Sequence, residues 1–430
     1  MRGSITATPH PRHATPLGPS VCDSLRRNIE FRDSVGSLVN VDKYTGSRML
    51  FVNETVIDSV DVFPLEAPLE EPFGYSQGWV TARTATLVRI TASDETTGWG
   101  ECFGPLAGTG DIIERLLAPE LVGEDPSDVE GLYDRCYAVA RRGYQSMVPY
   151  PALSGVDIAL WDLRGKRACK PIASHIGEVR REWVPAYATG HYFHRDVSFE
   201  TQCQRIVEEA RDNAKALGAI KLKIGLGLVG LDASADLTLV ERVVDAIPAG
   251  TTVMVDANYA YDELTAMRVG EALASLDVRW FEEPVAPEDE IAYRSLHEQL
   301  SIPIAGGECW DLPACNRIIR AGAVDILQPD ICAIGGLTPV TQLAKTLEPN
   351  DSIQLIPHVW GTPIAQAASL HLLATLPTTS WIEWDRSANP LREQLVPEPP
   401  RVDDSGAVVV PSGPGLGVTP EESALEEYAA

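Results

Sequence analysis

The sequence predicts an α/β protein, a TIM-type (β/α)7β barrel with an α+β capping domain formed by the N-terminal region and the C-terminal tail. From about residue 183, short apolar runs alternate with amphipathic stretches of helical length, which is typical of repeated βα units. Each run ends in a polar or charged residue, and the ends lie 22 to 36 residues apart: Tyr187, Lys223, Asp256, Glu282, Glu308, Asp330, His358 and Glu383. Eight such units predict a barrel whose strand ends open onto one face.

The chain ahead of the barrel has a different pattern. Residues 54–66 and 83–100 alternate apolar and polar side chains and predict an antiparallel strand pair. Apolar residues near helical spacing follow at 111–117, 126–142 and 151–165, which completes a small α+β domain. We therefore expect a disordered or non-native extension at 1–48, a capping domain at 49–182, a catalytic barrel at 183–392 and a tail at 393–430 that returns to the capping domain.

The composition is strongly acidic, with 61 acidic against 35 basic residues and a formal net charge of −26. Such a surface indicates a halophilic protein, because high internal salt screens the self-repulsion. Nucleic acid is excluded as a partner, since no basic stripe is present to replace the counterions around phosphates. No apolar run is long enough for a membrane span or a signal peptide, so we expect a cytoplasmic protein without a membrane partner.

Three carboxylates close apolar runs at equal spacing. Asp256, Glu282 and Glu308 would lie on consecutive barrel strands and meet near one point. Converging carboxylates repel one another strongly unless a cation neutralises them. All-oxygen ligation with room for water and substrate suits magnesium, with manganese as the alternative, rather than zinc. In a simpler interpretation, each carboxylate only caps the helix that follows it. That interpretation could account for one of the three, but it is disfavoured for all three together.

Lysine is scarce in this chain, yet two of its seven lysines, Lys221 and Lys223, are close neighbours. Alternate side chains of a strand share a face, so both ammonium groups should point into the barrel mouth. Like charges at close range lower each other's pKa, and we expect either lysine to be able to accept a proton near neutral pH. Two lysines on a strand usually form a solvated face, but their scarcity elsewhere argues against that interpretation here.

Three further polar residues end the last strands of the predicted barrel. Asp330 and His358 end consecutive strands, where the carboxylate could hold the imidazole in one tautomer and raise its basicity. This pair could act as an acid or a base, although a single histidine is more often structural. Glu383 completes the ring and could donate a hydrogen bond if it were protonated.

Taken together, these motifs resemble the enolase superfamily and, within it, the mandelate racemase subgroup. The segments KLK (221–223), DAN (256–258), FEEP (281–284), GGE (306–308), QPD (328–330) and PH (357–358) follow the superfamily's order. By matching position, the resemblance implies the following roles: Lys223 as the base with Lys221 beside it, Asp256, Glu282 and Glu308 as metal ligands, Asn258 as a contact of the substrate carboxylate, Asp330 and His358 as a dyad, and Glu383 as the electrophilic acid.

Longer strings resemble the subfamily of D-galactarolactone cycloisomerases and related sugar-acid dehydratases. They are GWGECFGP (98–105), YATG (187–190), WFEEPVAPE (280–288), AGGECW (305–310), PHVWGT (357–362) and EWDRSANP (383–390). The resemblance implies a sugar-acid or lactone substrate, a homo-oligomer, and substrate choice by capping loops at 72–79 and 102–110.

The expected reaction begins with magnesium and Lys221 holding the substrate carboxylate while Lys223 or His358 removes the α-proton. The enediolate then expels its β-oxygen. Opening of a lactone ring would make the enzyme a cycloisomerase, which is the preferred hypothesis. Loss of water from an aldonate or aldarate would make it a dehydratase, and simple reprotonation would make it an epimerase or racemase.

Two other classes remain to be weighed. The segment GLGLVG at 225–230 follows a predicted strand and imitates a dinucleotide-binding fingerprint, with Asp245 at a suitable distance. However, the glycines do not open a helix directly, and Asp245 lies in a helical pattern instead of ending a strand. A catalytically silent binding barrel is the third hypothesis, but such a protein would be expected to have lost ligands or bases that this chain retains.

Overall fold

The computed structural model describes residues 55–104, 106–145, 147–347, 352–378 and 380–430. The predicted extension at 1–48 lies outside these residues. The described residues form one compact unit, which contains the described part of the predicted capping domain and the predicted barrel. Among the described residues, no helix has both the length and the apolar character needed to cross a membrane.

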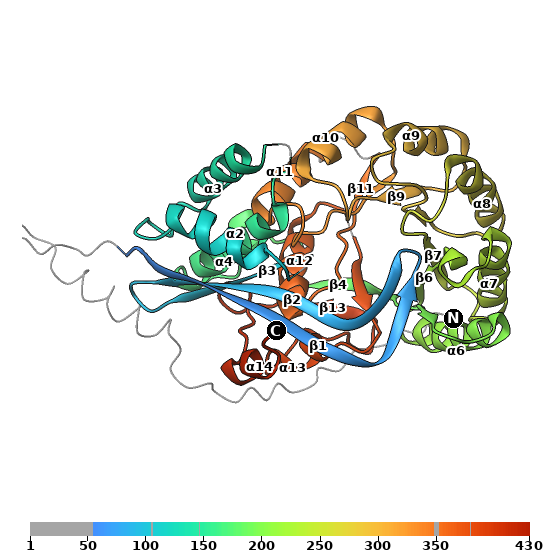
Figure 1. Cartoon of the computed structure of the whole chain (residues 1–430), viewed down its shortest axis with the longest axis horizontal. Coiled ribbons are helices and arrows are strands. Elements are labelled where there is room, and N and C mark those ends of the chain that lie inside the picture. Colours follow the sequence, from blue (N-terminus) through green and yellow to red (C-terminus); the bar gives the residue numbers. More distant parts are fainter. Residues whose placement is uncertain (1–54, 105, 146, 348–351, 379) are drawn as a thin grey trace, which may run out of the picture. The chain divides into compact units, whose positions relative to one another are not determined.

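The capping sheet is antiparallel and is dominated by one long hairpin. Strands β1 (Ile57–Tyr75) and β2 (Gly78–Ala92) form the hairpin, and β3 (Thr97–Cys102) pairs with the other edge of β2. The register of β1 against β2 shifts between Pro68 and Phe73, and an irregularity of this kind bends a strand. Figure 1 shows the hairpin curving toward barrel strands β6 (Ala219–Lys223) and β7 (Thr252–Asp256).

The strand predictions for this sheet were correct in type but wrong in extent. The first strand continues past residue 66 to Tyr75. The prediction ended too early because the apolar–polar alternation stops near the register shift, whereas the pairing with β2 continues beyond it. The predicted single strand at 83–100 is divided between β2 and β3 by a tight turn. In that turn the Asp94 side chain accepts a hydrogen bond from the Thr96 amide, and Glu95 has a φ of 67°.

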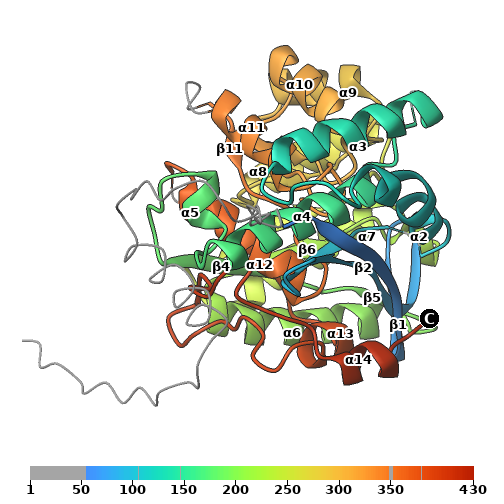
Figure 2. The same cartoon turned by 90° about the vertical axis from the view of Figure 1, so that its left-hand side faces the viewer.

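The helices of the capping domain confirm the three predicted helical segments. They are α2 (Thr109–Ile112) with the π-helix η1 (Ile113–Leu117) and the 3-10 helix η2 (Ala118–Glu120), then α3 (Val129–Tyr144), α4 (Tyr150–Arg167) and the short α5 (Ala173–Ile176). The side chain of Asp128 caps α3 by accepting a hydrogen bond from the Gly131 amide. Helix α4 is buried along most of its length, between the capping sheet and barrel helix α11 (Leu337–Leu347) (Figure 2).

Glycines on β3 allow α4 to lie unusually close to the sheet. A Cβ atom added to Gly98 would lie 2.1 Å from the carbonyl oxygen of Ala159, and one added to Gly100 would lie 1.9 Å from that of Gly155. Both contacts are with helix backbone, which cannot move as a flexible side chain would. Only glycine is therefore compatible with this spacing of strand and helix.

The barrel is a parallel sheet with eight strands along one path, wrapped by helices. The strands, in spatial order, are β11 (Gln354–Leu355), β10 (Ile326–Leu327), β9 (Ile304–Gly306), β8 (Phe281–Glu282), β7, β6, β4 (Trp183–Thr189) and β12 (Ile382–Asp385). The intervening helices are α6 (Phe199–Leu217), α7 (Ala233–Ala246), α8 (Glu263–Ser275), α9 (Glu290–Gln299), α10 (Leu312–Ala321), α11 and α12 (Pro363–Thr375). This order confirms the predicted barrel architecture.

The interior of the barrel is filled by a separate layer of side chains. Large residues such as Tyr187 and Trp280 alternate with small ones such as Ala219 and Ala305, and the ring centroids of Tyr187 and Trp280 lie 5.6 Å apart. The end strands β11 and β12 are joined by side chains. The Ser380 hydroxyl donates to the Leu355 carbonyl at 2.7 Å, and the Val359 amide donates to Glu383 at 3.1 Å.

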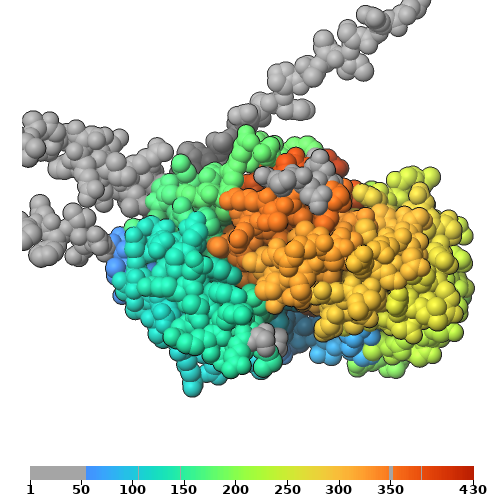
Figure 3. All heavy atoms as spheres, turned by 90° about the horizontal axis from the view of Figure 1, so that it is seen from above, coloured from blue at the N-terminus to red at the C-terminus, as the bar shows by residue number. Residues whose placement is uncertain are grey.

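Several hydrogen bonds join the capping sheet to the barrel. The short strand β5 (Phe193–His194), which follows β4, pairs with Phe73 and Gly74 of β1. At the hairpin tip, Ser76 Oγ and Gln77 Nε2 donate to the carbonyl oxygen of Asn258 at 2.8 and 2.7 Å. The space-filling view shows the teal capping helices packed directly against the orange barrel helices (Figure 3).

Buried acidic and basic residues reinforce the same junction. Glu101 of β3 accepts hydrogen bonds from the amides of Thr362 and Ala365 at the start of α12. Arg83 of β2 pairs with Asp385 of β12 at 2.9 Å, and both side chains are buried. The start of a barrel helix and the end of a barrel strand are thus held by the capping sheet.

The tail contacts both layers. Its strand β13 (Ala407–Val409) pairs antiparallel with β4, whereas the amide of Ala430 donates to the carbonyl of Pro64 on β1. Helices α13 (Pro390–Gln394) and α14 (Glu422–Glu427) flank it. The domain boundaries at 182 and 392 stay a prediction, since one compact unit spans both.

The close approach of α4 to β3 can be tested by substitution. Gly100→Ala should lower the free energy of unfolding by about 2–3 kcal/mol, because the new methyl group must displace the Gly155 carbonyl. Denaturant unfolding measures this change. Gly143→Ala is the matched control, because that glycine lies in α3 with nothing within 4 Å, and it should be neutral or stabilising by up to about 1 kcal/mol. Equal effects of the two substitutions would contradict the packing argument.

Candidate active site

The three carboxylates predicted to bind a metal lie together at the mouth of the barrel. Asp256 ends β7, Glu282 ends β8, and Glu308 follows β9 by two residues. One oxygen from each carboxylate lies within 4.8 Å of the others. Because parallel strands place their carboxyl ends at one edge, residues far apart in sequence form this group. All the donors are oxygens, which fits a hard divalent cation, and the identity of that ion stays a prediction.

Neighbouring donors orient these carboxylates. Glu282 accepts hydrogen bonds from the Trp280 indole at 2.9 Å and from the Gln328 side-chain amide at 2.8 Å. Asp256 accepts from the backbone amide of Asn258 at 2.9 Å. One oxygen of Glu282 and one of Asp256 are thereby fixed, a feature expected of groups that must hold a preset geometry.

Lys221 lies beneath this group and is fully buried. Its ammonium group pairs with Glu282, with Glu383 at 2.7 Å and with Asp256 at 3.8 Å. Burial alone would lower the pKa of Lys221, but these carboxylates outweigh it and hold the pKa well above its ordinary value. The side chain is not among those that line the cavity described below, so its predicted contact with substrate stays a prediction.

Lys223 reaches the cavity from the same strand. Its Nζ lies 2.5 Å from Asp256 and 2.9 Å from the side-chain oxygen of Asn258. Burial has the largest effect on the pKa of Lys223 and lowers it, and Lys221 lowers it too. Asp256, together with Tyr192 and Glu308, nevertheless holds the pKa above its ordinary value. Lys221 thus lowers the pKa of Lys223 as predicted, but the net shift of both lysines is upward because carboxylates lie close to each of them. Their role as proton acceptors stays a prediction.

The predicted dyad is present. His358 Nδ1 lies 2.7 Å from Asp330, and its Nε2 lies 3.1 Å from the metal-ligand candidate Glu308. An isolated parallel bridge between residues 330 and 358 extends the pairing of β10 and β11 and fixes their spacing. Burial lowers the pKa of His358, but Glu308, Glu383 and Asp330 together raise it to about 10. The predicted increase in basicity matches this direction.

The carboxyl group of Glu383 favours its ionised form in this arrangement. Burial would raise its pKa, but the nearby cations, above all Lys221, lower the pKa of Glu383 to about 2. One carboxylate oxygen contacts Lys221, and the other accepts a hydrogen bond from the Val359 amide. An ionised carboxylate that accepts at both oxygens does not donate a hydrogen bond, so the donor role, which requires a protonated carboxyl group, stays a prediction.

The backbone around the site adopts conformations that most residues avoid. Asn258, Tyr259 and Glu283 have φ angles of 41°, 51° and 43°. Positive φ at residues other than glycine stores strain and is concentrated at functional sites. Here the Ser76 and Gln77 bonds to the Asn258 carbonyl, together with the Asn258 amide bond to Asp256, hold the strained turn in place.

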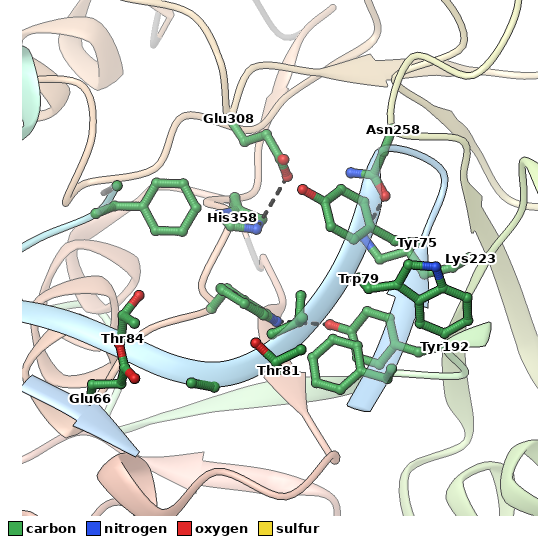
Figure 4. Close-up of a pocket in the computed structure, with 16 residues that line it drawn as sticks. Glu66, Tyr75, Trp79, Thr81, Thr84, Tyr192, Lys223, Asn258, Glu308 and His358 are labelled. Carbon is green, nitrogen blue, oxygen red and sulfur yellow. Dashed lines mark hydrogen bonds and ion pairs between the residues drawn. The ribbon is translucent and has the colours of Figure 1, made fainter. Parts of the chain in front are cut away.

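These residues border a cavity of about 460 Å³ between the barrel mouth and the capping hairpin (Figure 4). Lys223, Asn258, Glu308 and His358 form its barrel side. Both loops predicted to choose the substrate contribute to the lining, through residues such as Tyr75, Trp79 and Phe103. The cavity is therefore the site where the predicted catalytic and substrate-selecting groups meet.

Sequence reasoning missed part of the lining. Glu66 and Thr84 come from the interiors of β1 and β2, while Tyr192 and Trp360 come from barrel loops. Trp360 donates through its indole to the Tyr192 hydroxyl at 2.8 Å. Two segments quoted above, PHVWGT (357–362) and residues 72–79, contain aromatic residues. The tryptophan close to His358 was the sequence feature that could have predicted an aromatic cavity lining.

The dinucleotide-binding hypothesis fails at the segment 225–230. The amides of Gly225 and Leu226, which would have to bind phosphate, donate instead to the carboxylate of Asp236 at 2.8 and 2.9 Å. Asp245 lies inside α7 and does not end a strand. The segment is a structural turn, closed by an acidic residue that would repel a phosphate.

Family models match most of the described chain. Residues 58–177 match the mandelate racemase / muconate lactonizing enzyme N-terminal domain, and residues 205–424 match the enolase C-terminal domain-like family. The chain belongs to the enolase superfamily. The superfamily assignment confirms the resemblance inferred from the motifs. It also identifies this chain as an enzyme of the superfamily, whose relatives at this similarity are named cycloisomerases and dehydratases.

Individual superfamily members agree with this assignment. D-galactarolactone cycloisomerase from Agrobacterium fabrum is 36% identical over 86% of this chain and 98% of the relative. The structure of 3,6-anhydro-D-galactonate cycloisomerase from Zobellia galactanivorans has a TM-score of 0.78 at 33% identity, covering 87% of this chain and 99% of the other. An L-talarate/galactarate dehydratase liganded with Mg and L-glucarate has a TM-score of 0.76 at 26% identity, covering 91% and 96%.

The acidic group can be tested as a metal site. Glu308→Gln removes one anionic ligand while preserving side-chain shape, so Mg²⁺ affinity measured by isothermal titration calorimetry should fall by more than about tenfold. Glu288→Gln, at an exposed position in the loop before α9, is the control and should leave the affinity unchanged. Equal affinities of the two variants would exclude Glu308 as a ligand.

Proposed function

We propose that this chain catalyses Mg²⁺-dependent removal of the proton next to the carboxylate of a sugar acid, followed by β-elimination that opens a lactone ring. The observation that carries the proposal is that Lys223 and His358 line one cavity together with Glu308. Lys223 lies on β6, and His358 lies in the loop after β11. In the barrel, β4 and β12 lie between these two strands on the shorter side. The two bases can therefore approach a substrate from different sides.

The donor set supports a magnesium ion held by Asp256, Glu282 and Glu308. Such an ion supplies Lewis-acid stabilisation of negative charge on the substrate carboxylate. Asn258 lines the cavity, and its side-chain nitrogen makes only a long contact of 3.4 Å to Glu283, which supports the proposed contact with substrate. Lys221 adds a buried positive charge beneath the same carboxylates.

Lys223 and His358 carry out the proton transfers of the proposed reaction. Either Lys223 or His358 accepts the α-proton, and the electron pair left on carbon forms a double bond as the bond from the β-carbon to oxygen breaks. In a lactone this oxygen belongs to an ester and leaves as a carboxylate, so no proton is needed. In an open acid it leaves as water, with a proton from the other cavity cation. Lys223 and His358 both have raised pKa values in this structure, which suits either of them to the donor role. A cation held by Asp256 and Glu308 would offset the carboxylate charges that raise these values, and would so favour loss of the proton from the group that acts as the acceptor.

Lactone opening ranks first because of the similarity to D-galactarolactone cycloisomerase. The similarity to 3,6-anhydro-D-galactonate cycloisomerase supports ring opening in general, since its named substrate contains a cyclic ether. A sugar-acid dehydratase of the mandelate racemase subgroup is the second candidate, favoured by the structural similarity to L-talarate/galactarate dehydratase. An epimerase or racemase ranks third, because it needs only the first half of the reaction. The homo-oligomer, the cytoplasmic location, the halophilic character and the use of manganese stay predictions.

The reaction can be identified by mass spectrometry of the purified protein in high salt, with and without Mg²⁺, against aldaric acids, aldonic acids and their lactones. Conversion of a lactone into an open product of unchanged mass is the expected result. Loss of one water from an open acid would indicate the dehydratase instead. No Mg²⁺-dependent change across the panel would contradict both.

The two bases can be separated once a substrate is known. Lys223→Ala and His358→Asn should each lower kcat/KM by at least about 100-fold, because each removes a proton-transfer group. Incorporation of solvent deuterium at the α-carbon, followed by NMR, should persist only in the variant that retains the base. Lys215→Ala, at an exposed position of α6, is the matched control. Full activity in both cavity variants would overturn the assignment.

A further inference from the structure

The cavity has two chemically different ends. Lys223, Asn258 and Glu308 mark the end where the substrate carboxylate is expected, and His358 lies beside them. Figure 4 shows Glu66 and Thr84 together at the opposite side of the drawn site from Lys223 and Asn258. We call the part of the cavity bordered by Glu66, Thr81 and Thr84 the distal end.

The distal end is polar but not cationic. Among the described residues that line the cavity, the cationic groups are Lys223 and His358, and each already contacts a carboxylate. Glu66 and Thr84 face each other across β1 and β2 in register, and both side chains are exposed to solvent. Glu66 has no ion-pair partner within the described part of the chain.

Two arginines lie near the cavity without lining it. Arg83 is buried behind the aromatic wall, with its guanidinium 4.8 Å from the ring centre of Phe73, and it is held by Asp385 and by the carbonyl of Ala388. Arg195 lies 4.8 Å from the ring centre of Trp79 and is exposed. Neither supplies a charge to the cavity surface in this arrangement.

We propose that the substrate carries a single carboxylate, as in an aldonate or a sugar-acid lactone, and that Glu66 rejects acids with a second carboxylate. This inference rests on the proposed function for which end of the substrate faces the metal ligands. A neutral distal end can donate hydroxyl hydrogen bonds to the Glu66 carboxylate and bind the threonine hydroxyls. A second carboxylate would lie against Glu66 without a cation to pair with, which disfavours aldarates.

The aromatic wall supports a substrate of this kind. Phe73 and Tyr192 stack with ring centroids 4.1 Å apart, and both line the cavity beside Trp360. The parts of these rings that border the cavity are apolar, so they can pack against the C–H groups of a sugar chain or lactone ring and offer no cation to a free carboxylate. Charge and shape at the distal end thus favour the same class of ligand.

Matched pairs of acids test the inference directly. D-Galactonate and galactarate differ only at carbon 6, as do D-gluconate and D-glucarate, while D-galactaro-1,4-lactone compares a neutral ring with the open diacid. Binding to the full chain with saturating Mg²⁺ is measured by calorimetry, separately from turnover. We expect the neutral-ended member of at least one pair to bind at least about 30-fold more tightly than its dicarboxylate partner.

Substitutions assign the selectivity to Glu66. Glu66→Gln keeps the size and hydrogen-bonding capacity of the side chain but removes its charge. It should therefore strengthen dicarboxylate binding and reduce the affinity ratio within a matched pair at least about fivefold. Glu70 is an exposed acid on the same strand but outside the cavity lining, so Glu70→Gln should leave this affinity ratio unchanged. Equal behaviour of the two variants would overturn the role of Glu66.

The outcomes also separate this inference from the proposed function. If, in every pair that binds, the dicarboxylate binds as tightly as its neutral-ended partner, the inference is overturned, even if turnover of that dicarboxylate supports proton abstraction. Loss of that dicarboxylate binding in Arg195→Gln would identify Arg195 as the cation responsible. Selective binding of neutral-ended acids without any turnover would support the inference and contradict the proposed function, and absence of binding by every acid would overturn both.

Discussion

Mutual repulsion among carboxylates at the barrel mouth is the constraint on which the site depends. Asp256, Glu282, Glu308 and Glu383 come from four different strand ends, and the repulsion among them must be offset by positive charge. Lys221 and Lys223 provide part of it, and Lys221 does so from a position with no solvent exposure. A charge buried so deeply is tolerated only while its partners stay in place, since removing one leaves the others uncompensated.

This constraint explains why the surrounding groups are fixed so firmly. The indole of Trp280 and the amide of Gln328 each donate to Glu282, and the strained backbone at Asn258 is held from both sides. Each of these bonds limits the freedom of a charged side chain. The barrel supplies the geometry, because neighbouring parallel strands deliver their last residues to one edge.

The barrel half of the site was predictable from sequence for the same reason. A strand that ends in a carboxylate, repeated at constant spacing, leaves few arrangements other than convergence, so Asp256, Glu282 and Glu308 could be placed without coordinates. The ionisation of Glu383 could not, because it depends on how closely Lys221 approaches across the barrel. Sequence order says which residues share a face but not which oxygen faces which nitrogen.

The capping half was harder to predict because strand alternation carries no information about bends. The pattern at 54–66 identified a strand, but the register shift between Pro68 and Phe73 determines where the hairpin leads. Glu66 and Thr84 therefore read as ordinary exposed strand residues, and only the folded hairpin shows that they border the cavity. The division of 83–100 into two strands was missed for a related reason, since a four-residue turn interrupts an otherwise suitable pattern.

The hairpin also separates two kinds of evolutionary change. Substitutions at Glu66, Thr81 or Thr84 alter exposed strand positions that contact none of the buried charges of the barrel mouth. A duplicated gene could therefore explore new substrates through these positions while inheriting an intact set of acids and bases. Change at the barrel mouth has no such freedom, because each residue there neutralises another. Lineages with this architecture should accordingly diverge in what they accept well before they diverge in the chemistry they perform.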